Sequence, residues 1–499
     1  MSFPALENSY ARLPESFYAR IAPTPVAAPG LLRLNEALAE RLGLDPAWLA
    51  SPEGIAMLAG NRLPEDAEPI AMAYAGHQFG NFVPSLGDGR AVLLGERRDA
   101  EGIRYDIQLK GAGQTPFSRR GDGRSALGPV LREYLVSEAM AALGIPTTRA
   151  LAALATGESV YRERPLPGGI LVRVARCHVR VGTFEYFAQR GDEEAVRRLA
   201  DYVIERVHPD AAAAEDPYRA LLDGVVERQA ALIAQWLGVG FIHGVMNTDN
   251  TSISGETIDF GPCAFLDHYD PAKVFSSIDQ GGRYAFGRQP GIAVWNLARL
   301  AETLLPLFAT SPSGDGTSDR DAQVASAQAA LDAFEGRFEA HWQGILHRKL
   351  GLAKRNEAGL ALAGELLAAM AEQKADFTLT FRGLLQAVEA GADDDVARRA
   401  GFGDPAAFGT WAGRWRARLA EEGRTAEAIR NDLRSTNPAF IPRNHRIEQA
   451  IESAIDGDLA PFERLLAVVT RPYDDDPGRA DLADGPEPDE IVRQTFCGT

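Results

Sequence analysis

Two neighbouring segments hold the residues best suited to catalysis. Residues 241–250 read Phe-Ile-His-Gly-Val-Met-Asn-Thr-Asp-Asn, and residues 258–261 read Ile-Asp-Phe-Gly. Protein kinases have His-Arg-Asp, then an Asn beyond four further residues, then Asp-Phe-Gly; the Asn and the last Asp hold magnesium on the nucleotide phosphates. Here His243 takes the His position, and Asn250 and Asp259 take the two metal-ligand positions. The spacing therefore predicts a metal and nucleotide site.

The position of the kinase catalytic Asp holds Val245. A valine cannot accept a proton from a substrate hydroxyl, so the kinase mechanism of phosphoryl transfer is disfavoured. A carboxylate does occur nearby, at Asp249, immediately before the predicted metal ligand Asn250. His243 is expected to brace the loop backbone rather than to act as a catalyst.

Three upstream features could bind phosphate. Residues 87–90, Gly-Asp-Gly-Arg, combine an arginine with small residues that let backbone N–H groups approach phosphate oxygens. Lys110 ends an apolar strand pattern, and an inward lysine there needs an anion to balance it. Glu133 lies in a helical pattern and could hold Lys110 on phosphate. The simpler alternatives are a hairpin turn, a solvent-exposed edge lysine and a solvated helix face.

Strands and helices must position these residues. Residues 91–97, 104–110, 147–156 and 169–176 are predicted to be strands. The stretch from Leu127 to Leu143 has helical spacing, with Gly144 and Pro146 as stop signals. Further helices are predicted at 193–207, 217–237, 322–348 and 358–373. The predicted fold class is α+β, with a strand-rich N-terminal part and a large helical C-terminal part.

Composition excludes several classes of protein. Hydrophobic residues make up 45% and charged residues 24% of the 499 residues, as in globular proteins. The 52 basic and 69 acidic side chains give a net charge of −17, which disfavours nucleic acid and anionic lipid as partners. No stretch reaches the roughly 18 apolar residues of a membrane span, and no secretory signal or transit peptide is recognisable. With three scattered cysteines, we expect a soluble cytoplasmic protein without nucleic-acid or membrane partners.

Two segments are expected to lack regular structure. Residues 309–321 have no apolar period and are predicted to form a surface loop. Residues 473–490 are acidic and rich in proline and glycine, so they are predicted to be a flexible tether that carries Cys497. The predicted organisation is a lobe at 1–180 with the nucleotide-binding strands and the Lys/Glu pair, a helical lobe at 181–472 with the catalytic and metal-binding loops, and an acidic flexible tail at 473–499.

Several strings extend these features. They are YAGHQFG (74–80), LGDGR (86–90), QLKGAG (108–113), SRRGDGR (118–124), HGVMNTDN (243–250), DFGP (259–262), WNL (295–297) and IPRNH (441–445). Together they resemble the selenoprotein O family, the SelO/YdiU pseudokinases, over nearly the whole chain. The resemblance implies a protein-kinase-like bilobal fold. It also implies transfer of AMP from ATP to Ser, Thr or Tyr hydroxyls of proteins, with ATP flipped relative to kinases.

The resemblance also implies site residues. The nucleotide contacts would be Gly87, Gly89, Arg90, Lys110, Asp122, Gly123, Arg173 and Arg180, with Glu133 paired to Lys110. Asn250 and Asp259 would hold Mg²⁺ or Mn²⁺, and Asp249 would accept the proton; its alternative role is to support the metal. Without the family, Arg173 and Arg180 would be interpreted as exposed residues of an edge strand. His77 is expected to be packed or hydrogen-bonded rather than a metal ligand.

Three alternative functions and one mode of regulation remain to be tested. The alternatives are a protein or small-molecule kinase, a UMP transferase that uses Mn²⁺, and a nucleotide-binding scaffold without turnover. Some family members have selenocysteine at the place that corresponds to Cys497. A redox-regulated disulfide between Cys263 and Cys497 is therefore hypothesised, against the alternative of a buried Cys263 and an inert tail.

Overall fold

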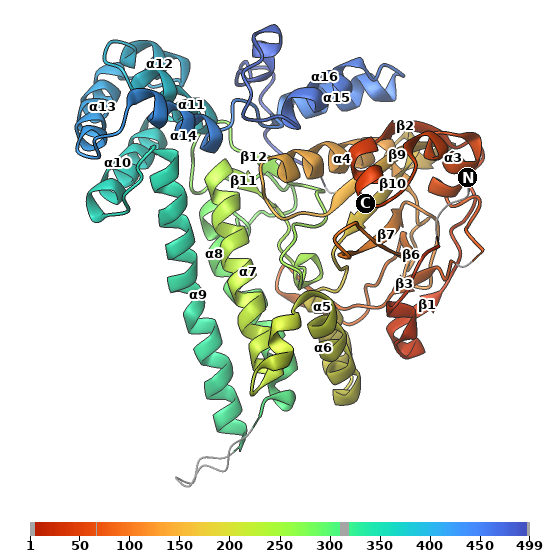
Figure 1. Cartoon of the computed structure of the whole chain (residues 1–499). Coiled ribbons are helices and arrows are strands. Elements are labelled where there is room, and N and C mark those ends of the chain that lie inside the picture. Colours follow the sequence, from red (N-terminus) through yellow and green to blue (C-terminus); the bar gives the residue numbers. More distant parts are fainter. Residues whose placement is uncertain (1–4, 66, 310–318, 497–499) are drawn as a thin grey trace.

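An antiparallel sheet forms the centre of the N-terminal part (Figure 1). The computed structural model describes residues 5–65, 67–309 and 319–496. The strands run in the order β1-β3-β6-β7-β10-β9-β2, and β8 pairs with β10. Their bounds are β1 (Tyr18–Arg20), β2 (Gly30–Leu34), β3 (Ile70–Met72), β6 (Ala91–Arg98), β7 (Arg104–Lys110), β8 (Ser125–Ala126), β9 (Arg149–Tyr161) and β10 (Pro165–Ala175). The four strands predicted from the sequence correspond to β6, β7, β9 and β10.

The register of the sheet places Lys110 in its middle rather than at an edge. Lys110 lies opposite Ala91 on β6 and opposite Leu171 on β10. On the next strand, Arg173 lies opposite Gln108 of β7. Because both neighbouring strands are paired, neither cation is a solvent-facing edge residue, and the alternatives stated for Lys110 and Arg173 are wrong.

Helices cover both faces of this sheet. The long helix α4 (Leu127–Ala142) packs on β9 and β10, and Gly144, with φ of 79°, follows its end as predicted. The small helices α1 (Glu36–Arg41), α2 (Pro46–Leu49) and α3 (Pro52–Leu58) contribute to a separate apolar cluster with strand residues such as Val92 and Val172. The sheet is therefore a rigid platform, buried on both faces by apolar residues.

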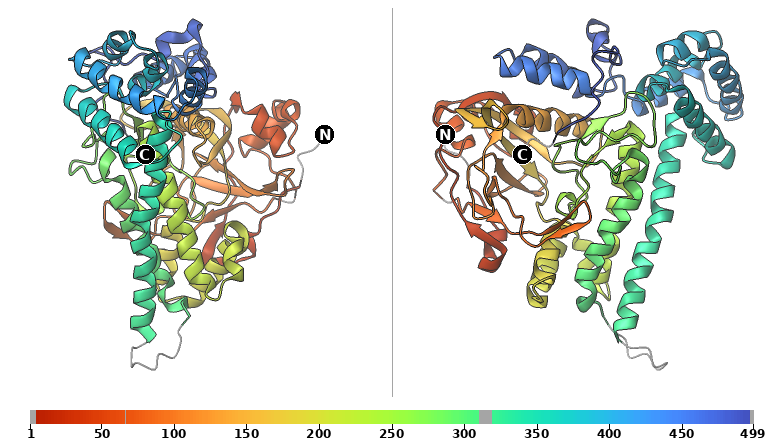
Figure 2. Two further views of the ribbon diagram at one scale, coloured as in Figure 1. Left: turned by 60° about the vertical axis from the view of Figure 1, so that its left-hand side comes forward. Right: turned by 180° about the vertical axis from the view of Figure 1, so that it is seen from behind.

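The C-terminal part is almost entirely helical. Helix α7 (Pro217–Val239) lies beside the long helix α9 (Asp319–Lys349), and a group of shorter helices, residues 357–436, gathers at one end of α9 (Figures 1 and 2). The other helices are α5 (Val181–Ala188), α6 (Glu193–Val207), α8 (Gln289–Leu304), α10 (Glu357–Gln373), α11 (Phe377–Ala387), α12 (Asp393–Arg399), α13 (Pro405–Ala420), α14 (Ala426–Thr436), α15 (Asn444–Ile455) and α16 (Ala460–Val469). The mixed α and β composition is thus confirmed. Within the described ranges, no helix combines the length and the apolar character that a membrane span requires.

The four predicted helices correspond to α6, α7, α9 and α10, with ends that differ by at most a few residues. Long alanine- and leucine-rich stretches identified them, and regular apolar spacing is strong only in α6. The predicted surface loop at 309–321 falls mostly on residues 310–318, which lie outside the described residues; α9 already begins at Asp319.

The tail differs from the flexible tether predicted at 473–490. Leu482 and Ala483 are buried, and Arg443 donates a hydrogen bond of 2.9 Å to the Ala483 carbonyl. Asp475 accepts from Arg382 at 2.5 Å. Further on, Thr495 is buried and its hydroxyl donates to the Pro262 carbonyl at 2.5 Å. The acidic composition misled the prediction, because a few anchoring contacts hold the segment on the body.

Candidate active site

A two-residue ladder carries both loops of the site. Strands β11 (Phe241–Ile242) and β12 (Ala264–Phe265) pair, and residues 243–263 run between them. Helix α7 stops at Gly240, whose φ of 75° turns the chain into β11. The loop that ends at Asn250 and the loop that holds Asp259 are therefore two arms of one hairpin.

His243 braces these two arms, as the sequence predicted. Its Nε2 donates to the Ile258 carbonyl at 2.9 Å, and its backbone N–H donates to Gln289 Oε1 at 3.0 Å. The ring is buried and stacks on Trp236, with 5.4 Å between the ring centres. Burial lowers the pKa of His243, which keeps the imidazole neutral. His243 is a structural link between the loop that ends at Asn250 and the loop that holds Asp259.

Asp249 and Asn250 stand together at the end of the first arm, in a short 3₁₀ turn (Thr248–Asn250). Asp249 is buried, and within the described chain its Oδ1 has no hydrogen-bond partner. Burial raises its pKa to about 7, against the opposing charge of Arg180. Asn250 donates from Nδ2 to the Val245 carbonyl at 3.0 Å, which directs its amide oxygen away from the loop.

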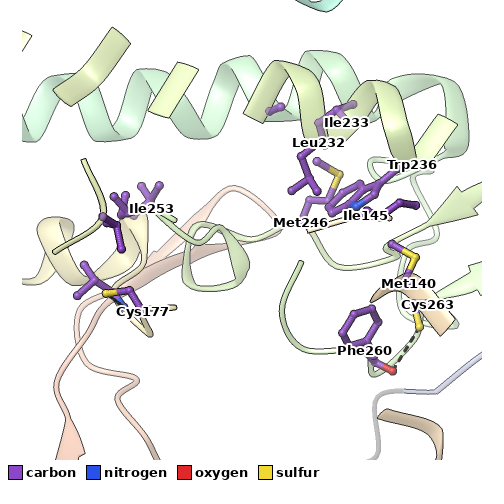
Figure 3. Close-up of a cluster of buried hydrophobic side chains, with 14 of the residues drawn as sticks. Met140, Ile145, Cys177, Leu232, Ile233, Trp236, Met246, Ile253, Phe260 and Cys263 are labelled. Atoms are coloured by element: carbon purple, nitrogen blue, oxygen red, sulfur yellow. Dashed lines mark hydrogen bonds between the residues drawn. The ribbon is translucent and has the colours of Figure 1, made fainter. Parts of the chain in front are cut away.

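Asp259 occupies the left-handed region, with φ of 65°. Phe260 is buried, and its ring lies 6.1 Å from that of Phe241 in an edge-to-face contact. Figure 3 shows Phe260 in the apolar cluster with Met140, where its carbonyl accepts a hydrogen bond from Cys263 at 3.4 Å. An anchored phenylalanine and a tight turn together push the Asp259 carboxylate out of the core toward the sheet.

Three cations surround the Asp259 carboxylate. Lys110 Nζ lies 2.7 Å and Arg173 Nη1 lies 2.9 Å from Oδ1, and Arg180 Nη2 lies 3.7 Å from Oδ2. Burial opposes ionisation, but these positive charges prevail and hold the pKa of Asp259 well below its usual range. Glu133 and Asp88 also lie within 4.0 Å of these cations, so three positive charges are balanced by three carboxylates, and a polyanionic ligand would compete with those carboxylates for the cations.

Glu133 and Gln108 accept hydrogen bonds from two of these cations, Lys110 and Arg173. Glu133 of α4 accepts from Lys110 at 2.6 Å and from Arg173 at 3.2 Å. Gln108 of β7 accepts from Arg173 Nη2 at 2.6 Å. The predicted pairing of Lys110 with Glu133 is therefore present, and Arg173 shares it.

Glycines let the 87–90 turn and a second loop approach their neighbours closely. Gly87 has φ of 65°, and a Cβ there would lie 2.3 Å from the Phe117 ring. A Cβ on Gly123 would lie 2.2 Å from the backbone of Gly113. Asp122 is exposed and pairs with Arg162 at 2.8 Å. The loop 117–124 thus closes over the 87–90 turn only because these glycines lack side chains.

One cleft of about 560 Å³ collects these residues. Its lining includes Gly87, Gly89, Arg90, Lys110, Asp122, Gly123, Arg173, Arg180, Asp249, Asn250 and Asp259, all predicted from the sequence, and also Ile278. Glu133 stays behind the cleft wall. A larger hollow of about 690 Å³ lies between α4 and α16, away from this chemistry, and its buried Glu138 is engaged by Arg149.

The donor set suits a hard divalent cation. Asp259 offers a carboxylate and Asn250 an amide oxygen, and Mg²⁺ typically takes one or two such protein ligands together with phosphate oxygens and water. Among the described residues no group of three or more His, Cys, Asp or Glu side chains could hold a metal by itself. The site therefore fits a cation that arrives with a nucleotide rather than one held by protein alone.

Comparison with known proteins decides the family. A sequence profile described as protein adenylyltransferase SelO matches residues 4–470. The chain belongs to the SelO family. Proteins named protein nucleotidyltransferase YdiU are similar over the full length: 64% identity to one from Bradyrhizobium sp. (strain ORS 278), covering 100% of this chain and 99% of the relative. Relatives of the same name from Methylorubrum extorquens and Rhodopseudomonas palustris (strain BisB18) are 62% and 60% identical, with the same coverage.

Membership of the SelO family makes the chain a nucleotidyltransferase. This result agrees with Val245 at the position of the kinase base. Sequence reasoning did not single out Gly76, Gln78 and Glu185, which lie beside residues 247–250. The string YAGHQFG pointed to the first two, but nothing in the sequence pattern marked Glu185 on α5.

Proposed function

We propose that this SelO-family protein transfers AMP from ATP to hydroxyl groups of protein Ser, Thr or Tyr residues, within a kinase-like bilobal arrangement. The observation that carries the proposal is the buried Oδ1 of Asp249, unpartnered within the described chain, in the same cleft as the cations Lys110, Arg173 and Arg180. A carboxylate placed there can accept a proton, whereas Val245 cannot.

The reaction joins the substrate oxygen to the α-phosphorus of ATP. The bond between that phosphorus and the oxygen bridging to the β-phosphate breaks, and pyrophosphate leaves. The hydroxyl proton passes to Asp249. Pyrophosphate carries most of the developing charge, so Lys110, Arg173 and Arg180 are assigned to the β- and γ-phosphates. This assignment requires ATP to lie flipped relative to its orientation in kinases.

Asn250 and Asp259 would hold Mg²⁺ or Mn²⁺. When bound, the cation would neutralise phosphate charge and orient the triphosphate. The turn at Gly87 and Gly89 and the side chain of Arg90 would receive the rest of the nucleotide, with loop 117–124 above it. Glu133 keeps Lys110 in place while ATP enters.

A labelling experiment tests the reaction. The full chain is incubated with Mg²⁺ and ATP labelled on the α- or the γ-phosphate, and in parallel with UTP and Mn²⁺. Label from the α-position on protein, with a mass increase of one AMP, is expected, and Asp249→Asn should abolish it. Transfer of γ-label would identify a kinase, UMP transfer a uridylyltransferase, and no transfer of any label a scaffold.

A disulfide between Cys263 and Cys497 is proposed as a redox control of this site. Cys263 follows the metal loop and is buried, and Cys497 lies outside the described residues. Thr495, two residues before Cys497, contacts Pro262, the neighbour of Cys263. The described end of the tail is therefore held beside the residue that precedes Cys263.

A further inference from the structure

A small β-hairpin packs against the loop 243–250. It consists of β4 (Gly76–Gln78) and β5 (Asn81–Val83), which pair with each other and not with the main sheet. Its Phe79 N–H donates to Asn247 Oδ1 at 3.0 Å, and Tyr284 donates to the same oxygen at 2.6 Å. The hairpin is therefore tied to the loop that ends in Asp249 and Asn250.

The Thr248 hydroxyl is the central link. A hydroxyl has one proton to donate and lone pairs to accept with. Thr248 Oγ1 accepts from the His77 N–H at 2.6 Å and donates to Glu185 Oε2 at 2.5 Å. Thr248 is fully buried, so no water can replace these bonds. One hydroxyl thus joins the hairpin, α5 and the catalytic loop, one residue before Asp249.

Both oxygens of Glu185 are engaged. Oε1 lies 2.5 Å from Nδ1 of His77, and Oε2 accepts from Thr248. Glu185 is buried on α5, the helix whose N-terminal cap is Arg180. Arg180 in turn donates to the Asp249 carbonyl at 3.1 Å. The same short helix therefore fixes the catalytic loop at two successive residues, 248 and 249.

The hairpin also lies very close to Asp249. A Cβ on Gly76 would sit 2.5 Å from Asp249 Oδ1 and 2.9 Å from its Cβ. Gln78, at the end of the same strand, lines the same cleft as this carboxylate. A small shift of the loop relative to the hairpin would therefore move the carboxylate within the cleft.

We propose that Glu185 is a positioning residue for AMP transfer: acting through the Thr248 hydroxyl, it holds Asp249 at the cleft wall beneath the hairpin. The inference rests on the proposed function, because it takes Asp249 as the proton acceptor. Among the described residues, the Glu185 carboxylate touches none that is assigned to nucleotide binding. Its loss should therefore affect the maximal rate and leave ATP binding nearly unchanged.

Three variants of the full chain test the proposal. Glu185→Gln keeps the size of the side chain but loses one of two acceptors. Thr248→Val removes the hydroxyl at nearly constant volume, and Thr248→Ser keeps it. We measure the maximal rate of AMP transfer, both to the chain itself and to casein as a generic acceptor, and pyrophosphate release, together with the ATP concentration at half-maximal rate and the melting temperature.

Glu185→Gln and Thr248→Val are expected to lower the maximal rate about 10- to 100-fold, with the half-saturating ATP concentration within about twofold of wild type. Thr248→Ser should stay within about threefold of wild type. Thr303→Val is the matched control, since its buried hydroxyl donates to the Leu300 carbonyl of its own helix. If Glu185→Gln fails to fold, the Thr248 pair decides.

Two results would overturn the inference: wild-type rates in Glu185→Gln and Thr248→Val, or a Thr248→Ser variant as slow as Thr248→Val. Asp249→Asn, measured in parallel, separates this from the proposed function. If Asp249→Asn keeps its activity, the role of Asp249 itself is wrong. If Asp249→Asn lowers the rate to a level that can still be measured, adding Thr248→Val should lower that remaining rate no further, because the two residues act through one group.

Discussion

The ammonium nitrogen of Lys110 lies 2.7 Å from Oδ1 of Asp259, so a predicted phosphate ligand and a predicted metal ligand neutralise each other. Arrival of a metal at Asp259 and of phosphate at Lys110 must separate this pair. Each event therefore favours the other, and by linkage the effect is reciprocal. We expect metal and ATP to bind cooperatively, with an ATP affinity that rises as Mg²⁺ is added.

Asp259→Asn tests this coupling. The variant should lose metal-dependent transfer at least about 100-fold, or ~3 kcal/mol of transition-state stabilisation. In the absence of metal it should bind pyrophosphate more tightly than wild type, because Lys110 and Arg173 lose their counter-charge. Isothermal titration with pyrophosphate and EDTA measures this affinity. Asp395→Asn, on an exposed helix far from the cleft, is the charge-matched control. Weaker pyrophosphate binding by Asp259→Asn would contradict the coupling.

Gly76→Ala should impair transfer, because its methyl group would meet the Asp249 carboxylate at 2.5 Å. We expect about a 10-fold or larger loss of rate, with the cleft cations untouched. Gly364→Ala in α10 is the control: no described atom lies within 4 Å of the added Cβ, and a helical Gly→Ala exchange should stabilise by about 0.5–1 kcal/mol. Normal transfer by Gly76→Ala would show that the hairpin can move away at little cost.

Lys349→Met is expected to stabilise the protein. Lys349 is buried, its ammonium lies 4.2 Å from the ring centre of Phe381, and the described residues offer it no ion pair. Burial lowers its pKa to about 7. The shift from 10.5 corresponds to a free-energy cost of about 5 kcal/mol for the charged ammonium in the folded protein. Its contact with the aromatic rings offsets about 2 kcal/mol of this cost. Chemical denaturation at pH 7 should therefore show a gain of about 3 kcal/mol, while the exposed Lys354→Met changes little.

The pH dependence of that gain has a definite sign. The folded-state pKa of Lys349 lies below the unfolded one, so the unfolded chain binds the proton more readily. Wild type should lose stability relative to Lys349→Met as pH falls from about 10.5 to about 7, and the difference should level off below that range. A difference that is constant from pH 7 to pH 10 would mean that the lysine is charged in the folded protein.

Oxidation should join Cys263 to Cys497 only slowly. Burial raises the pKa of the Cys263 thiol to about 12, and the thiolate is the reactive form. Non-reducing peptide mapping after mild oxidation is expected to show the crosslink, with a rate that decreases when Thr495→Val removes the hydrogen bond that holds the tail beside Pro262. Cys177, which is also buried, serves as the internal control. The absence of a disulfide-linked Cys263–Cys497 peptide pair in oxidised protein would contradict the redox proposal.

The sequence predicted the elements with a strong local pattern. Strand β7 ends at Lys110 as expected, since its alternation stops at the glycines that follow. Asp249, Asn250 and Asp259 were found because a short loop motif fixes their spacing. That they meet Lys110 and Arg173 in one cleft agrees with the prediction, although their roles stay proposals.

Contacts between residues far apart in the chain could not be predicted from the sequence. Glu185 meets Thr248 across 63 residues, and no periodicity marks such a pair. Arg173 looked like an exposed strand residue, because alternation alone does not show that β10 is covered on both sides. The prediction for the tail was wrong for a related reason: its composition is that of a disordered segment, whereas a few buried residues such as Leu482 and Thr495 decide its position.

The pairing of β11 with β12 has a consequence for heat inactivation. Both arms of this hairpin begin at this ladder of two residues per strand, and bridges from Thr147 to Thr257 and from Arg180 to Ser252 attach them farther on. If the ladder and these bridges open together, Asp249, Asn250 and Asp259 are displaced together, while the helices and the large sheet stay folded. Enzyme activity should therefore vanish at a lower temperature than overall melting, and hydrogen exchange at Phe241 and Phe265 should report the approach of that loss.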